Sequence, residues 1–193
     1  MSAEIRLLGK TYLNFKARPF GNYTRRQMSA AAAYTIFCHA EFESFLEGWA
    51  FAITEFADVN WKAKRSTRPL THLCTFHEGR KELSSVPPKD IWSEMINKAI
   101  KQHRGIISQN NGIKENNVCK LFAPVGFDVR KIDTVLLGDL SAFGAIRGDH
   151  AHQSHRLQIG KTFDPFDRQA KAEALLTLLA DLDIELNTYL ASC

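Results

Sequence analysis

The sequence predicts an all-α fold, a bundle of about five to six helices, two of them long. Apolar residues recur at spacings of three and four from about Thr24 to Asp58, and again from Pro165 to Leu190. This is the period of one face of an α-helix, and no segment shows the alternation typical of a half-buried strand. With 193 residues and 45% hydrophobic content, the chain is expected to form a single domain, residues 1–193, with a buried core.

The N-terminal segment and the first long helix come first along the chain. Residues 1–21, closed by Pro19-Phe20-Gly21, are expected to be an arm that packs on the domain. Either Asn22 or Thr24 can cap the helix that follows, which runs to about Asp58. Its predicted buried face comprises Ile36, His39, Phe42, Leu46, Trp49, Ile53 and Phe56. On this face His39 is expected to be a core histidine and not a catalyst.

Residues 61–86 interrupt the helical pattern and are rich in lysine and arginine, with Trp61 and Phe76 interleaved. Such a segment can follow a phosphate backbone while its aromatic rings stack on bases. The alternative, which we favour, is a solvated connection with a short helix near Leu73.

Three further helices follow. One is predicted from Asp90 to about His103, ended by Arg104-Gly105, with Trp92, Met95, Ile96, Ala99 and His103 facing inward. A short helix at 114–122 must stop near Pro124, because proline disfavours helix at the residue before it. Asp133 then caps a helix at 134–147, whose core face comprises Leu136, Leu137, Leu140, Phe143 and Ile146.

The last helix opens at Asp164-Pro165, an N-cap residue followed by proline at the first helical position. It extends to about Leu190, and residues 153–163 before it are expected to form a loop. Its apolar seam, fit to pack in a bundle or against a second subunit, comprises Ala172, Leu175, Leu179, Leu182, Leu186 and Tyr189.

The segment FGAIRGDHAHQSH, residues 143–155, carries the candidate chemistry. It holds Arg147, Asp149, His150, His152 and His155 within nine residues. Arginine is always charged and binds phosphate through a planar fork, while histidine exchanges protons near neutral pH. These residue types together suit a site that cuts a phosphodiester.

The arginine and histidine spaced five apart, Arg147 and His152, resemble the ribonuclease motif of the HEPN superfamily. The resemblance covers roughly residues 25–190, and includes His39-Ala40-Glu41-Phe42-Glu43, Gly112-Ile113-Lys114 and residues 121–128. It implies a small HEPN-like helical bundle that forms a homodimer and cuts RNA without a metal or cofactor. Arg147 and His152 would then be catalytic, and an antitoxin or other regulatory protein is a possible partner in a toxin or antiviral-defence system.

The resemblance also matches Glu43 to an acidic residue that many HEPN domains carry on this helix. A glutamate there can orient Arg147 by paired hydrogen bonds, and a merely exposed surface glutamate is the alternative.

Helix geometry and family spacing favour different histidines as the partner of Arg147. At about 100° per residue, His152 lies roughly 140° from Arg147, whereas His150 lies nearly beside it. Gly148 can end or bend the helix, and Asp149 can cap a new turn that brings His152 round. We therefore expect His152 to be catalytic, with Asp149 and His150 in support. A metal site built from Asp149, His150 and His155 matches no trusted spacing.

The charge and the cysteine content of the chain indicate the kind of partner and the cellular location to expect. The formal charge of +4 favours an anionic partner only mildly. Four widely separated cysteines and the lack of a signal-peptide or membrane-spanning pattern lead us to expect a cytoplasmic protein. Two other interpretations stay open: a non-catalytic helical module that binds RNA, a nucleotide or a protein, and an arginine and histidine that merely cap helix ends.

Overall fold

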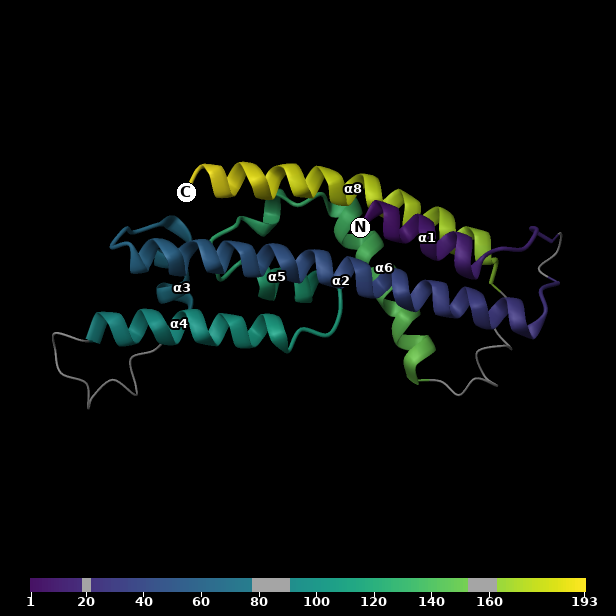
Figure 1. The fold of residues 1–193 in the computed structure, drawn as a ribbon, viewed down its shortest axis with the longest axis horizontal. Helices are drawn as coiled ribbons and strands as arrows, with labels where there is room; N and C mark the ends of the chain where they lie inside the picture. The colour runs from purple at the N-terminus through teal and green to yellow at the C-terminus, as the bar shows by residue number, and fades with distance from the viewer. Residues whose placement is uncertain (19–21, 78–90, 153–162) are drawn as a thin grey trace. The chain divides into compact units, whose positions relative to one another are not determined.

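The computed structural model describes residues 1–18, 22–77, 91–152 and 163–193, with residues 148–152 described by their backbone alone. These residues form seven α-helices and one short 3-10 helix, without a strand among them, so the all-α prediction is confirmed (Figure 1). The elements are α1 (Ser2–Tyr12), α2 (Arg25–Lys62), α3 (Arg68–Phe76), α4 (Ile91–Ser108), α5 (Glu115–Phe122), η3 (Val129–Lys131), α6 (Thr134–His152) and α8 (Pro165–Ala191).

The chain divides into two compact units. The first unit comprises Met1–Phe45, Gly112–Glu115 and Asp133–Leu182. The second comprises Leu46–Asn111, Asn116–Ile132 and Asp183–Cys193. Both long helices contribute to each unit, α2 through residues 25–45 and 46–62, and α8 through residues 165–182 and 183–191. Within the described ranges, no helix has the length and apolarity needed to cross a membrane.

Helix α2 begins as the sequence predicts. The Thr24 hydroxyl accepts a hydrogen bond from the Gln27 backbone N–H at 3.3 Å, and the Gln27 side chain accepts one from the Thr24 backbone N–H at 2.9 Å. This reciprocal capping box satisfies two amide donors that have no partner within the helix. The predicted face needs one correction in the first unit: Ile36 is 38% exposed. The buried residues there are Met28, Ala31, Tyr34, Thr35, Cys38, His39 and Phe42.

The N-terminal arm of the first unit is itself a helix, α1. It buries Ile5, and its Gly9 backbone comes close to α8, because a Cβ built there would lie 3.5 Å from Gln169 Nε2. Figure 1 shows α1 running along the first half of α8. The capping residue predicted for α8 is confirmed, since Asp164 Oδ1 accepts a hydrogen bond from the Phe166 backbone N–H at 2.8 Å.

Helix α6 also starts where predicted, with Asp133 Oδ1 accepting a hydrogen bond from the Val135 backbone N–H at 2.7 Å. Leu136, Leu140 and Phe143 are buried, and the Phe143 ring meets the Phe42 ring of α2 edge to face with centroids 5.5 Å apart. This packing holds α6 against residues 25–45 of α2 within the first unit.

In the second unit, the predicted short helix near Leu73 is confirmed as α3. The predicted end of α4 at Arg104-Gly105 is wrong, because the helix continues to Ser108 and buries Ile107 in its last turn. Trp92 is 66% exposed and not inward-facing as predicted. The periodicity of apolar residues identifies the buried face of a helix. It does not show how far along the helix other parts of the chain cover that face.

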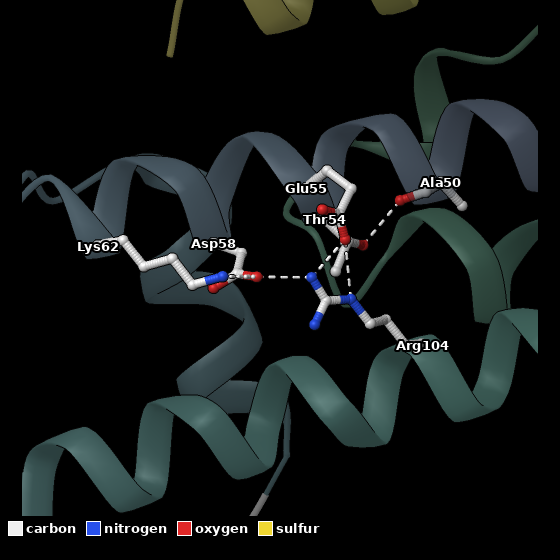
Figure 2. Close-up of polar contacts among 6 residues, drawn as sticks. All are labelled: Ala50, Thr54, Glu55, Asp58, Lys62 and Arg104. Atoms are coloured by element: carbon white, nitrogen blue, oxygen red, sulfur yellow. Dashed lines mark hydrogen bonds and ion pairs between the residues drawn. The ribbon is translucent and has the colours of Figure 1, made fainter.

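A charged network joins α4 to residues 46–62 of α2 (Figure 2). Arg104 donates hydrogen bonds to Glu55 and, at 2.6 Å, to Asp58, while Lys62 Nζ donates to Asp58 at 3.0 Å. Burial alone would raise the pKa of Asp58, but the hydrogen bonds from Arg104 and Lys62 outweigh it and hold the pKa below its ordinary value. The side chain of Asp58 is 6% exposed, so its charge is compensated within the unit.

Candidate functional site

The motif arginine lies near the end of α6, in the first unit. α6 runs without a break from Thr134 to His152, so Gly148 does not end the helix as the sequence analysis allowed. Along a continuous helix, position 150 lies about 60° from position 147 around the axis, and position 152 about 140° from it. The backbone therefore sets Arg147 and His152 on different faces of one helix.

Gly144, one turn before Arg147, lies close to residues outside α6. A Cβ built on Gly144 would lie 3.3 Å from Ile113 Cγ1, 3.4 Å from Lys114 Cγ and 3.9 Å from His39 Nε2. The distance to Ile113 is shorter than most contacts of a Cβ, whereas the distance to His39 is an ordinary van der Waals contact. The absence of a side chain thus allows α6 to pack closely against residues 112–115.

His39 of α2 lies at this crossing and is 2% exposed. Its Nδ1 is 3.8 Å from Oε2 of Glu43, one turn further along the same helix. The Glu43 side chain is only 17% exposed, so the interpretation of Glu43 as an exposed surface glutamate is wrong. The i, i+4 spacing of these two residues places both on the side of α2 that packs against α6.

The imidazole of His39 is uncharged at neutral pH. Burial lowers its pKa to about 4, and the nearby positive charge of Arg147 lowers it in the same direction. The expectation of a core histidine agrees with this burial. The structure adds that His39 is also an electrostatic neighbour of the motif arginine, although the two residues are far apart in sequence.

The Arg147 side chain is partly exposed to solvent. None of the ion pairs formed among the described residues involves it, so within that part of the chain its charge is not neutralised by a carboxylate. A guanidinium in this setting keeps five N–H donors and a full positive charge for an anion that reaches it from solvent.

The remaining motif residues are placed only in part. Asp149, His150 and His152 lie in the last turns of α6, but their side chains lie outside the described part of the structure, and His155 is outside it altogether. Among the residues that the structure does describe, no three histidine, cysteine or acidic side chains gather as metal ligands.

Two neighbours of the site were missed from the sequence. The built Cβ of Gly144 lies within 4 Å of both Lys114 and His39, yet Gly112-Ile113-Lys114 enters the sequence analysis only as part of the resemblance to HEPN domains. A usable signal existed for Gly144, because a glycine inside an apolar helical face often marks a close approach between backbones. For His39, the usable signal was its i, i+4 spacing to Glu43.

Two cations of the basic segment make contacts within the second unit. Lys62 pairs with Asp58, and the Arg68 guanidinium lies over the Tyr189 ring, 5.5 Å from its centroid. Both contacts favour a structural role for these two cations over a track for nucleic acid.

Comparison with known proteins adds no relative: no family model matches the chain, and searches of the curated proteins and the solved structures return no significant match.

Proposed function

We propose that the first unit is a metal-independent endoribonuclease of the toxin or defence type, as the resemblance to HEPN domains implies. The observation that carries the proposal is the state of Arg147. Arg147 is partly exposed, its positive charge acts on the uncharged imidazole of His39, and it forms none of the described ion pairs. It also stands five positions before His152 on one continuous helix. Such a guanidinium is suited to bind the phosphate of a ribose-phosphate chain.

The proposed reaction is attack of a ribose 2′-OH on the adjacent phosphorus. A histidine takes the proton of the 2′-OH as its oxygen forms the new P–O bond, and the 5′-oxygen leaves and takes up a proton. Arg147 stabilises the negative charge that builds on the phosphoryl oxygens. The products are a 2′,3′-cyclic phosphate and a 5′-hydroxyl. DNA lacks the 2′-OH and is not cut.

Because α6 is continuous, its geometry constrains which histidine can take the proton beside Arg147. Within one protomer, position 150 lies closer to Arg147 than position 152 does. A catalytic His152 is therefore best explained by a homodimer in which His152 of one copy faces Arg147 of the other. If the active site lies within one protomer, helix geometry favours His150.

The test is cleavage of total RNA in the presence of EDTA by the full chain and three variants. Arg147→Ala is expected to remove nearly all cleavage. His152→Ala should do the same if the site is shared between two copies, and His150→Ala if it lies within one. Circular dichroism and the mass in solution should match those of the wild type. RNA left intact by the wild-type protein would reject the enzyme and favour the non-catalytic binding module.

A further inference from the structure

We propose that His77 and His103 form an acid-sensitive contact in the second unit, which holds the C-terminal end of α3 against α4 while both rings are uncharged and releases it when the pair takes up a proton. Both histidines belong to the second unit. The proposal therefore does not depend on the ribonuclease function, which is assigned to the first unit.

The two rings connect α3 to α4. His77 is the C-terminal capping residue of α3, and its backbone N–H donates a hydrogen bond to the Leu73 carbonyl at 3.0 Å. His103 lies in α4, which packs against α3 (Figure 1). The ring centroids of the two histidines are 5.7 Å apart, with an angle of 45° between the ring planes. Movement of the end of α3 away from α4 therefore breaks this ring contact.

The polar atoms of the pair are buried and unpaired. His103 is fully buried and His77 is partly buried. Three of the four ring nitrogens, Nε2 of His77 and both nitrogens of His103, are buried and form no hydrogen bond. Neither solvent nor a hydrogen-bond acceptor is in place there to stabilise a charge. Imidazoles in such a setting strongly favour the uncharged form.

The groups around the pair oppose protonation. Within the described part of the chain, neither histidine takes part in an ion pair with a carboxylate. Arg104, next to His103 in α4, is paired with the carboxylates of α2. Burial, and then His77, lower the pKa of His103 to about 4, and the Leu121 carbonyl of α5 offsets this only in part. Burial also lowers the pKa of His77.

The start of α3 is held by contacts that do not change with pH in the same range. The Arg68 guanidinium lies 5.5 Å from the centroid of the Tyr189 ring, and the Leu70 N–H donates a hydrogen bond to the Thr67 hydroxyl. Arginine stays protonated and these hydroxyl groups stay uncharged between pH 7.5 and pH 4.5. Acid should therefore open the last turn of α3, which ends at His77, before the first turn.

The test is amide hydrogen exchange of the full chain, followed by NMR at pH 7.5 and pH 4.5 and corrected for the intrinsic exchange rate at each pH. A histidine whose pKa is about 6.5 when open and about 4 when closed raises the opening constant by roughly 50- to 100-fold at pH 4.5. The protection factor of the His77 amide should fall by about this factor. Because the opening is local, this protection factor should also stay below those of Ile53 and Ala57, two buried residues of α2.

Three single variants and one double variant test the role of each ring. His103→Phe should remove most of the fall in protection, and the double variant His77→Phe/His103→Phe nearly all of it, because phenylalanine keeps the ring contact but cannot take up a proton. His77→Phe alone should raise the pKa of His103, since the neighbouring imidazole no longer opposes its proton. His72→Phe is the matched control, because His72 is an exposed histidine of the same helix, and it should leave the fall in protection unchanged.

Three results would overturn the proposal. The first is a protection factor for the His77 amide that is the same at both pH values, or that falls equally in the wild type and in the double variant. The second is an unchanged pKa of His103 in His77→Phe. The third is equal protection of the His77 and Ile53 amides at pH 4.5, which would mean that acid unfolds the whole unit at once. None of these results bears on cleavage of RNA.

Discussion

Two glycines of α6 provide a direct test of how closely this helix packs at the candidate site. Gly138 has no atom within 4 Å of a Cβ built upon it, whereas at Gly144 that Cβ would lie 3.3 Å from Ile113 Cγ1. Replacing a glycine inside a helix by alanine stabilises it by about 0.5–1 kcal/mol, because the unfolded chain loses conformational freedom. Both variants receive this gain, so the difference between them reports the packing.

The extra methyl group at position 144 cannot be accommodated freely. Ile113 is fully buried, so it cannot turn into solvent, although the neighbouring Lys114 is exposed and can move. Overpacking of a core typically costs about 1–3 kcal/mol. We therefore expect Gly138→Ala to stabilise the protein by about 0.5–1 kcal/mol, and Gly144→Ala to be less stable than Gly138→Ala by about 1–3 kcal/mol.

The assay is urea-induced unfolding of the two variants and the wild type, followed by far-ultraviolet circular dichroism. An NMR titration of His39 should accompany it, because displacing α6 at position 144 also changes the distance between His39 and Arg147. Equal stabilisation by both substitutions would refute the close approach of α6 to Ile113, and with it the geometry from which the site is built.

Three other predictions follow from single observations. Gly126 has a φ of +80° and a built Cβ 2.3 Å from His72 Cδ2, so Gly126→Ala should lower the thermal midpoint markedly through at least about 2 kcal/mol of strain and overlap. Gly48 has open space around it, so Gly48→Ala should not lower the thermal midpoint. Equal thermal midpoints for the two variants would contradict this prediction. Burial, and then His77, lower the pKa of His103 to about 4. Because the unfolded chain takes up this proton near pH 6.5, stability should fall between pH 6.5 and 4 by up to about 3 kcal/mol for this group. His103→Phe should flatten urea midpoints measured across that range, and an unchanged slope would argue against a neutral His103. If the active site is shared between two copies, mixing inactive Arg147→Ala and His152→Ala proteins should restore roughly a quarter of wild-type cleavage by random pairing, and a mixture as inactive as its components would argue against a shared site.

The sequence predicts the helices well where the signal is local. Thr24, Asp133 and Asp164 each cap the helix that they were expected to cap, because an N-cap needs only a short polar side chain and the amides two or three residues later. Glycine was less reliable as a helix end. α4 passes through Gly105, since the cost of a glycine in a helix, about 1 kcal/mol, is outweighed by burial of Ile107.

The candidate site was predictable only in part. The spacing of Arg147 and His152 is visible in the sequence, and so is the i, i+4 relation of His39 and Glu43. The proximity of Arg147 to His39 is not, because it depends on how α6 packs against α2. Similarly, α6 continues past Gly148. Local helix propensity alone did not decide whether the helix would end at this glycine.

The most direct measurement of the central claim is cleavage of a defined RNA oligonucleotide in EDTA, with the products identified by mass spectrometry. We predict fragments ending in a 2′,3′-cyclic phosphate and beginning with a 5′-hydroxyl. A single 2′-deoxy substitution at the cleaved position, or the change Arg147→Ala in the protein, should prevent the cut. Cleavage at the wild-type rate after the 2′-deoxy substitution would show that the ribose 2′-OH does not drive the reaction, and cleavage at that rate by Arg147→Ala would show that the α6 guanidinium does not.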